Sequence, residues 1–496
     1  MWLALQPCDA LAQLRLPGGG GVGGLPLGSL GGGVGGIGPP LPGSPLGIGA
    51  PEPVNDRLVL PALSVPLGPA PTGALTSTLN GPITGTVSNA RQGAANTVNR
   101  IGQGPAAAKQ ALPARRSGVP PAGERRYVPD EVVIALPSTL SPQALDALAR
   151  RHRLVRVASE SIGLTATTFH RWRIADARSV SDVIRALEAD GGVRTAQPNY
   201  RFTLQQGVAA AAAPRLVQQY AVDKLDLAQA HRLATGNTCL IAVIDSGVDT
   251  AHPEIAAAIA GRFDAVDPAA PPDNHGTAIA GAISAHAQLT GVAPTARILA
   301  IRAFSATEST TLAILKGIDW AVANGARIIN MSFAGPQDPE IARALAAARR
   351  KGVLLVAAAG NAGPKSPPLY PAADPNVIAV TATDADDRLL KVANRGRHIA
   401  LAAPGVDIVV PATGGGYQVS SGTSVAAAHV SGIAALLLEL QPGLAPDAVR
   451  KILQSTAKDL GPKGRDDQFG AGLANAYRAV RSLRPDVTPV AASTAQ

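Results

Sequence analysis

Three polar residues, Asp245, His275 and Ser424, each lie in a short motif of small residues: AVIDSGVD, NHGTAIAG and SGTSVAAAHVSG. A serine hydroxyl is a weak nucleophile, so it needs an imidazole to take its proton and a carboxylate to hold that imidazole in the right tautomer. Together the three side chains predict acyl transfer through a covalent serine intermediate. Each motif alone also has an ordinary structural explanation: a turn residue at a strand end, a structural histidine, or a helix N-cap.

A fourth polar residue, Asn361 in AAAGNAG, directly follows the apolar run VLLVAAAG. The oxyanion formed in acyl transfer needs preorganised hydrogen-bond donors, and an asparagine amide is one of the side chains that supply them. Ser424 begins an apolar, alanine-rich segment, and the free N–H groups at the start of such a helix favour negative charge. Asn361 and the Ser424 N–H are therefore donors of the right type for an oxyanion, although a turn-forming Asn-Ala-Gly is the alternative reading of the Asn361 motif.

The elements that must position these residues alternate along residues 220–483. Near-continuous apolar runs predict parallel strands covered on both faces: CLIAVID, RILAIRAF, ARIINMSF, VLLVAAAGN, NVIAVTAT and HIALAAPG. Helical segments lie between them, notably TTLAILKGIDWAVANG, PEIARALAAARRKG and the run after Ser424. The pattern predicts an α/β fold with a doubly wound, mostly parallel sheet, in which Asp245 lies at the end of a strand.

The order Asp, His, Ser and the four motifs resemble the subtilase family of serine proteases over residues 220–483. The resemblance implies that Asp245 orients His275, that His275 shuttles the proton, and that Ser424 attacks. It also implies that Asn361 and the Ser424 N–H hold the oxyanion. It implies that residues of one strand pair with extended substrate backbone: Ser332, Phe333, Ala334 and Gly335. It also implies that three small residues line the primary specificity pocket: Ala358, Ala359 and Gly360.

Four small residues depart from the usual pattern of this family. Ala278 replaces a second histidine, and Ala334 replaces a glycine, so that a methyl group narrows the cleft. Val425 and Ala428 stand where the family usually has Met and Pro. Val425 removes an oxidisable thioether beside the nucleophile, which predicts activity that tolerates peroxide. Ala428 restores a backbone N–H near the helix start.

The loop AHAQLTG after the His275 segment contains no Asp or Glu. Calcium prefers several carboxylate or carbonyl oxygens. We therefore expect no cofactor and no metal ligands, and we expect the calcium site that many subtilases have at this loop to be absent. Calcium binding elsewhere stays open.

Upstream, residues 127–204 predict a small α+β unit. EVVIAL, RLVRVAS, TTFHRWRI and VRTAQPNYRF read as strands. SPQALDALARRH reads as a helix with Ser141 at the N-cap, and SVSDVIRALEADGG as a helix closed by Gly191. The order βαββαβ is ferredoxin-like. Placed before the Asp245 motif, the unit resembles a subtilase propeptide, which implies an intramolecular chaperone and inhibitor; by itself it could be any small binding module.

The remaining segments are assigned by composition. Residues 205–219, QQGVAAAAAPRLVQQ, are small and easily extended, so we expect the maturation cut there. Residues 13–126 are rich in Gly, Pro and Ala and predict a disordered segment. Residues 1–12 end in ALA and resemble a truncated signal peptide, with an apolar N-terminus as the alternative. Residues 484–496 predict a loose tail, and we expect no apolar stretch long enough to span a bilayer.

Charge and cysteine content exclude other classes. The net charge is +9, but no lysine-rich run occurs, so we expect no nucleic-acid partner. Cys8 and Cys239 form no disulfide framework or zinc motif. The leading hypothesis is a monomeric endopeptidase, secreted or held in the periplasm or cell envelope, made as a zymogen and acting on polypeptides. A sedolisin-type peptidase would need a Glu base, which His275 argues against; a catalytically silent subtilase-fold binding protein is the alternative.

Overall fold

The computed structural model describes residues 117–137, 139–205, 207, 209–211, 219–266 and 271–484. The expected signal peptide at 1–12, residues 13–116 of the Gly/Pro/Ala-rich segment and the tail after residue 484 lie outside the described residues. So does most of the expected processing linker, of which residues 205, 207, 209–211 and 219 are described.

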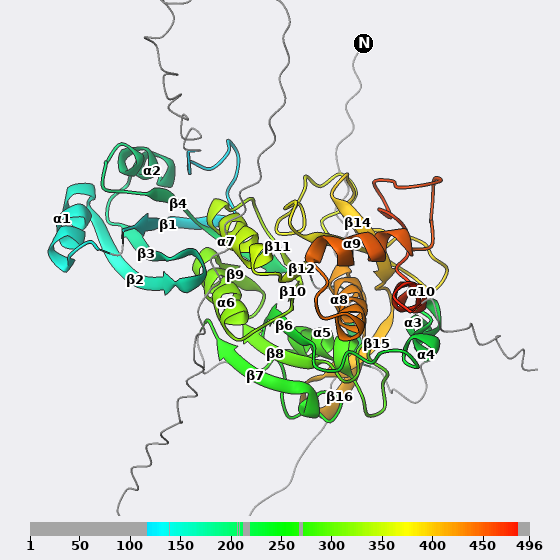
Figure 1. The fold of residues 1–496 in the computed structure, drawn as a ribbon. Coiled ribbons are helices and arrows are strands. Elements are labelled where there is room, and N and C mark those ends of the chain that lie inside the picture. Colours follow the sequence, from blue (N-terminus) through cyan, green and yellow to red (C-terminus); the bar gives the residue numbers. More distant parts are fainter. Residues whose placement is uncertain are drawn as a thin grey trace, which may run out of the picture. The chain divides into compact units, whose positions relative to one another are not determined.

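The N-terminal unit has the predicted order βαββαβ (Figure 1). Its elements are β1 (Tyr127–Leu136), α1 (Pro142–His152), β2 (Leu154–Ile162), β3 (Thr167–Ile174), α2 (Val180–Glu188) and β4 (Thr195–Leu204), with a 3-10 turn η2 (Gly163–Thr165). The strands form an antiparallel sheet in the order β4-β1-β3-β2, which is the ferredoxin-like arrangement. Both helices begin at the expected kind of residue, because Ser141 and Ser179 accept a hydrogen bond from the first turn.

The central strand β1 of this sheet is buried on both faces. Alternate residues of a strand point to opposite faces, and in β1 Val132 and Ile134 lie in the cluster under α1 and α2. Val133 and Ala135 belong instead to a cluster shared with the larger C-terminal unit. The N-terminal unit therefore uses one face for its own core and the other for a second, interdomain core.

Residues 117–126 correct the expected disordered segment at its C-terminal end. The Ser117 hydroxyl and the Gly118 N–H donate to the Glu188 carboxylate at 2.8 and 2.6 Å, and Val119 packs against the core under the helices. The composition of this stretch suggested disorder, but its partner is a carboxylate at the end of α2. The start of this stretch is therefore held in place by a hydrogen bond between residues 70 positions apart in the sequence.

The C-terminal unit is built on a seven-stranded parallel sheet in the order β14-β13-β12-β10-β6-β8-β7. The strands are β6 (Leu240–Asp245), β7 (Ile259–Asp264), β8 (Arg297–Arg302), β10 (Ile328–Met331), β12 (Leu354–Ala358), β13 (Ile378–Thr383) and β14 (Ile399–Pro404). Strands β8 and β7 lie on one side of β6, and strands β10, β12, β13 and β14 lie on the other. The sheet is therefore doubly wound, as predicted. Asp245 is the last residue of β6, the strand at which the order reverses.

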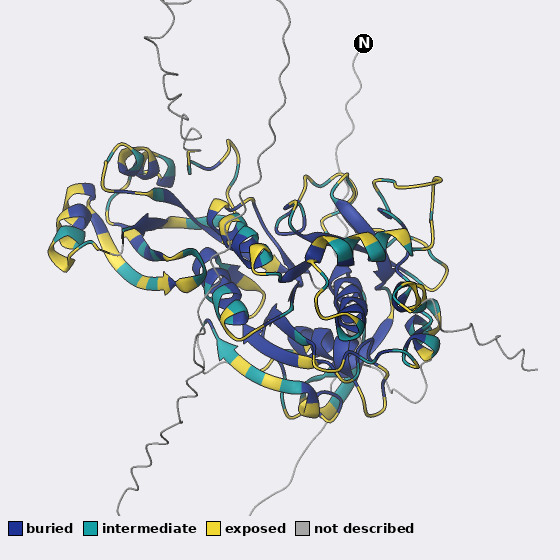
Figure 2. Ribbon diagram, viewed as in Figure 1, coloured by how far each residue is buried: buried dark blue, intermediate teal, exposed yellow. Residues whose placement is uncertain are grey.

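Helices cover both faces of this sheet. One face carries α5 (Asn274–Ser284) and α8 (Thr423–Leu440), and the other carries α6 (Thr311–Ala323) and α7 (Pro339–Arg350). The smaller helical elements are α3 (Tyr220–Lys224), α4 (Leu227–Ala230), α9 (Pro446–Ser455), α10 (Ala476–Ser482), η4 (Ala256–Ala258) and η5 (Thr413–Gly415). In Figure 2, α8 and the strands of the sheet other than the edge strand β7 are almost wholly buried, as the apolar runs predicted.

Helix α8 is long and apolar enough to cross a membrane by length and composition alone, with a mean hydropathy of 1.5. However, 89% of that stretch is buried inside the protein, which makes it a core helix. The expectation that no stretch reaches this length is therefore wrong. Ser, His and Gly interrupt the apolar run in the sequence, yet the whole helix lies in the core.

Short strands connect the two units. Strand β4 pairs antiparallel with β9 (Glu308–Thr310) and with β11 (Phe333–Ala334) of the C-terminal unit. Beyond it, β5 (Ala209–Ala211) pairs antiparallel with β16 (Gly416–Ser420), which pairs with β15 (Ile408–Ala412). The end of the N-terminal unit thus crosses the C-terminal unit in extended form.

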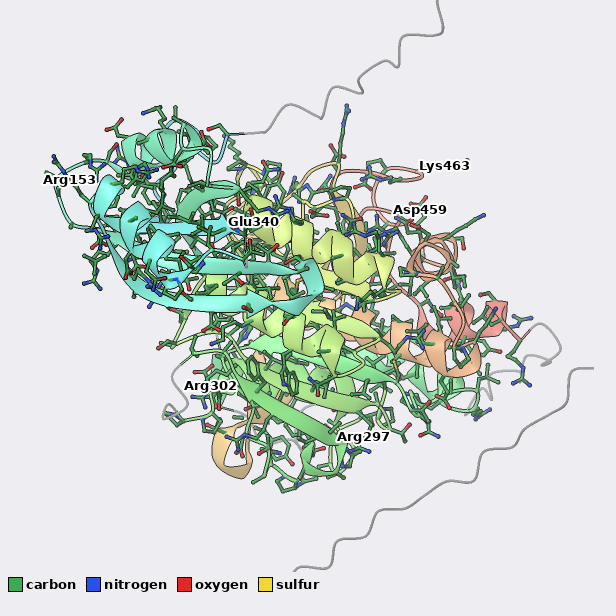
Figure 3. All side chains as sticks on the ribbon, turned by 60° about the vertical axis from the view of Figure 1, so that its left-hand side comes forward. Arg153, Arg297, Arg302, Glu340, Asp459 and Lys463 are labelled. Carbon is green, nitrogen blue, oxygen red and sulfur yellow. The ribbon has the colours of Figure 1, made fainter. Side chains whose placement is uncertain are left out.

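Two buried carboxylates at the start of α7 bind the N-terminal unit. Asp338 accepts from the Gln197 side chain at 2.8 Å, and Glu340, labelled in Figure 3, accepts from the Thr195 hydroxyl at 2.7 Å. Burial raises the pKa of both carboxyls above the ordinary range. Because Thr195 and Gln197 lie on β4, these bonds anchor the strand that enters the C-terminal unit.

Candidate active site

Asp245 and His275 form a buried pair. The His275 Nδ1 lies 2.7 Å from Asp245 Oδ1, and the Asp245 side chain is fully buried. Gly247, with φ of 102°, turns the chain after β6, and a Cβ on Gly276 would lie only 2.1 Å from the Gly247 carbonyl oxygen. Two glycines therefore let the start of α5 approach the end of β6 closely enough for the pair to form.

Asp273 fixes the position of His275 on its helix. Its carboxylate caps α5 by accepting from the His275 N–H at 2.8 Å, and the Ser246 hydroxyl donates to the same oxygen at 2.8 Å. Burial opposes a charged imidazolium, but the charges of Asp245 and Asp273 and the hydrogen bond to Asp245 raise the pKa of His275 above its ordinary value. Nδ1 donates to Asp245 when the ring is neutral, which leaves Nε2 as the basic nitrogen.

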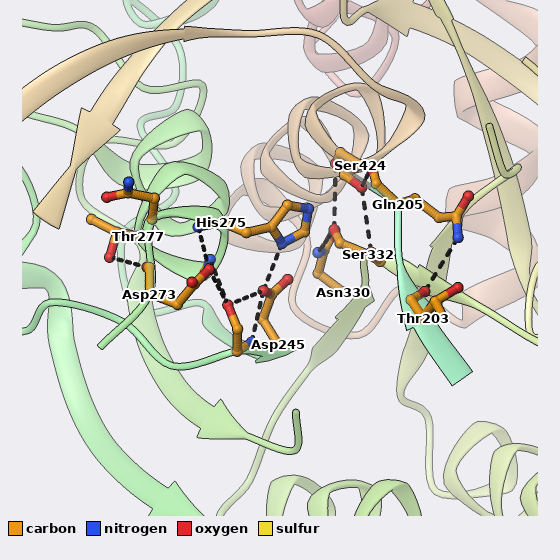
Figure 4. A network of polar contacts seen from close by, with 12 residues as sticks. Thr203, Gln205, Asp245, Asp273, His275, Thr277, Asn330, Ser332 and Ser424 are labelled. Atoms are coloured by element: carbon orange, nitrogen blue, oxygen red, sulfur yellow. Dashed lines mark hydrogen bonds and ion pairs between the residues drawn. The ribbon is translucent and has the colours of Figure 1, made fainter. Parts of the chain in front are cut away.

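Ser424 is the second residue of α8 and is buried. In Figure 4 the ring of His275 lies between Asp245 and Ser424. His275 Nε2 is buried and has no hydrogen-bond partner among the described residues. The Ser424 hydroxyl instead donates to the backbone carbonyl of Gln205 at 2.8 Å, with the Ser332 carbonyl oxygen at 3.3 Å.

Asn361 binds the same Gln205 carbonyl oxygen. Its Nδ2 donates to that oxygen at 3.0 Å, and its Oδ1 accepts from the Thr423 hydroxyl at 2.9 Å. The Thr423 bond orients the amide so that its donor points at the carbonyl. One backbone carbonyl thus lies within hydrogen-bonding distance of both the serine hydroxyl and the asparagine amide.

The segment that carries this carbonyl is held as an extended strand. The Gln205 N–H donates to the Ser332 carbonyl at 3.1 Å, Leu204 pairs with Phe333, and Thr203 pairs with Ala334. On the opposite edge, Phe202 and Thr203 pair with Ser309 and Glu308. The end of β4 is therefore bound between two strands, in the manner of a peptide added to a sheet.

The seven residues expected to bind substrate separate into two groups. Ser332, Phe333 and Ala334 contact β4 through the backbone, and a Cβ on Gly335 would lie 2.3 Å from the Phe202 ring. Ala358 and Ala359 are fully buried, and the Gly360 N–H donates to the Thr423 hydroxyl at 3.1 Å. The contact with the Gln205 side chain comes from the next residue, Asn361, whose N–H donates to Gln205 Oε1 at 2.7 Å.

The residues that depart from the family pattern fit their surroundings. Ala278, Val425 and Ala428 are buried in the core cluster around α8. Ala334 pairs with Thr203, so its methyl group leaves room for a bound strand. His429, in the same motif as Ser424, donates from Nδ1 to the Pro404 carbonyl oxygen at 2.8 Å, and burial lowers its pKa to about 4. A histidine so buried is structural.

Three residues of this region were not predicted from the sequence: Gln205, Asp273 and Glu254. Asp273 precedes the His275 helix, and an acidic residue at that place is a recognisable N-cap signal. Gln205 was assigned only to a linker. Glu254 is fully buried and accepts from the N–H groups of Ala287, Gln288 and Leu289, in the loop where calcium was considered. Among the described residues no group of three or more His, Cys, Asp or Glu is placed to hold a metal ion.

Comparison with known proteins agrees with this fold. Residues 236–472 match the model of the Subtilase family, and residues 113–199 match that of the Fervidolysin N-terminal prodomain. The chain is 34% identical over 372 residues to the thermophilic serine proteinase of Bacillus sp. (strain AK1), covering 71% of this chain and 88% of that protein. It is 36% identical over 273 residues to thermitase of Thermoactinomyces vulgaris, covering 53% of this chain and 96% of thermitase.

Among solved structures, fervidolysin from Fervidobacterium pennivorans, described as a keratinolytic enzyme related to subtilisin, superposes with a TM-score of 0.62 at 26% identity. The match covers 73% of this chain and 62% of the fervidolysin chain. The chain therefore belongs to the subtilase family of serine proteases, and it carries an N-terminal prodomain. The predicted family and fold class are confirmed; the role of each site residue remains a prediction.

Proposed function

We propose that this chain is a zymogen that cuts its own peptide bond after Gln205 and then acts as an endopeptidase on other polypeptides. The observation that carries the proposal is the Gln205 carbonyl oxygen, which lies 2.8 Å from Ser424 Oγ and 3.0 Å from Asn361 Nδ2. This carbonyl belongs to the chain itself. It directly follows β4, whose last residues are paired between two strands as a substrate would be. The expected maturation cut within 205–219 is thereby narrowed to the Gln205–Gln206 bond.

In this mechanism Ser424 Oγ attacks the carbonyl carbon of Gln205, and the hydroxyl proton passes to Nε2 of His275. Asp245 holds the ring through Nδ1, so Nε2 is the nitrogen free to take the proton. The oxyanion accepts from Asn361 Nδ2 and from the Ser424 N–H at the start of α8. His275 then gives the proton to the leaving amine of Gln206, and water hydrolyses the acyl-enzyme to a Gln205 carboxylate.

After the cut the prodomain remains bound through surfaces that do not depend on the cleaved bond. Asp338 and Glu340 still accept from Gln197 and Thr195, and the second face of the prodomain sheet still packs on α6 and α7. We propose that the prodomain inhibits the protease in this state. Export to the cell envelope or beyond is part of the same proposal, since a relative is named an extracellular protease.

Active-site labelling tests this function against a catalytically silent binding protein. A fluorophosphonate forms a covalent bond only with an activated serine, so the matured chain, once separated from the prodomain, is expected to be labelled at Ser424. The Ser424→Ala variant is expected to remain unlabelled, whereas Ser455→Ala, which alters an exposed serine of α9, is expected to label like the unchanged protein. Failure of the matured, unchanged protein to label would support the silent binding protein.

A further inference from the structure

Gln205, the residue directly after β4, is enclosed in the cleft and is only 8% exposed. From its contacts we infer that this protease selects polypeptides with glutamine directly before the cleaved bond. The inference rests on the proposed function, since the Gln205 carbonyl defines which bond is cut.

The glutamine is recognised by its amide. Gln205 Oε1 accepts from the backbone N–H of Asn361 at 2.7 Å, and Gln205 Nε2 donates to the Thr203 carbonyl of the same strand at 3.2 Å. Both the oxygen and the nitrogen of the Gln205 amide therefore have hydrogen-bond partners in an enclosed place, and the Asn361 N–H has an acceptor. A side chain without an acceptor leaves that N–H unpaired, which costs binding.

Two side chains of similar shape to glutamine distinguish recognition of the amide from recognition of side-chain shape. Methionine fills similar space but supplies no strong acceptor for the Asn361 N–H, so we expect cleavage about tenfold slower, the value of one net hydrogen bond. Glutamate supplies the acceptor, but its second oxygen would face the Thr203 carbonyl oxygen where Nε2 now donates. We expect glutamate to be cleaved more slowly than glutamine for that reason.

The test uses peptides of the form Phe-Thr-Leu-Z followed by a fluorogenic leaving group, with the enzyme matured from the full chain and separated from the prodomain. We expect kcat/KM for Gln at Z to exceed that for both Met and Glu at Z. Equal rates for the three peptides, or a preference for Met over Gln, would overturn the inference.

Hydrolysis of unstructured casein provides the separate readout for the proposed function. An enzyme that digests casein but ranks the peptides otherwise would overturn the specificity and leave the protease function standing. An enzyme that cleaves neither casein nor any peptide would overturn the proposed function itself.

Discussion

Glu254 is expected to stabilise the loop after the His275 helix in place of a metal ion. Its Oε1 accepts from the N–H groups of Gln288 and Leu289 at 2.7 and 3.1 Å and from the Tyr417 hydroxyl at 2.8 Å. Its Oε2 accepts from the Ala287 N–H at 2.9 Å. Every contact is with a donor, so the carboxylate offers no free oxygen to a cation and binds the loop directly.

Glu254→Gln changes the side chain by one group and keeps its shape. The amide nitrogen would face the Ala287 N–H, so one bond is lost, and the remaining three lose their charged acceptor. Because hydrogen bonds to charged groups contribute about 1.5–3 kcal/mol each, we expect a loss of roughly 3 kcal/mol. For a domain of this size, such a loss lowers the unfolding midpoint by about 6–10 °C.

The assay is thermal unfolding of the full chain in a Ser424→Ala background, which prevents self-digestion, at one fixed scan rate. Asp447→Asn is the control, because that carboxylate is exposed and its loss is expected to cost less than about 0.5 kcal/mol. Neither calcium nor a chelator is expected to move the midpoint of the parent chain. A Glu254→Gln midpoint within about 2 °C of the control, about one-third of the expected effect, would refute the reasoning. A large fall in the unfolding midpoint of the parent chain on chelation would refute it as well.

Three further predictions concern the active site. The neighbouring carboxylates raise the pKa of His275, so the ring stays protonated, and unable to act as a base, up to a higher pH. We therefore expect kcat/KM to fall as the pH drops through a midpoint above the ordinary 6.5, and Asp273→Asn to lower that midpoint. A midpoint below 6.5 would contradict this. Asn361→Ala should lower kcat by roughly 10²–10³-fold with a smaller effect on KM, and an unchanged kcat in steady-state assays would remove Asn361 from the oxyanion site. Activity should survive mild peroxide, because Val425 adjoins Ser424, Met331 is fully buried, and burial raises the pKa of Cys239 to about 12; rapid loss of turnover with no other modification detected by mass spectrometry would argue otherwise.

Much of the fold could be predicted because the signals are local. Asp245 ends an apolar run that becomes β6, and Ser141 and Ser179 cap the two prodomain helices. Glu254 could not be found in this way, because its hydrogen-bond donors lie more than 30 residues further along the chain.

The same limit applies to the cleft. Nothing in the sequence around Gln205 distinguishes it from the rest of a small-residue linker, and only the pairing of β4 with β9 and β11 brings its carbonyl to Ser424. Residues 117–126 were assigned to a disordered segment by composition, whereas their order depends on Glu188 at the end of α2. Chemistry-bearing motifs were readable from the sequence; the long-range contacts that complete the site were not.

The most direct measurement of the central claim is the N-terminus of the mature protein, determined by intact mass and terminal sequencing after expression of the full chain. The account predicts a chain that begins at Gln206, accompanied by a prodomain that ends at Gln205, and a Ser424→Ala chain that stays uncut at this bond. A mature N-terminus elsewhere would contradict cleavage after Gln205, and cutting of Ser424→Ala at the same bond would contradict self-processing by Ser424.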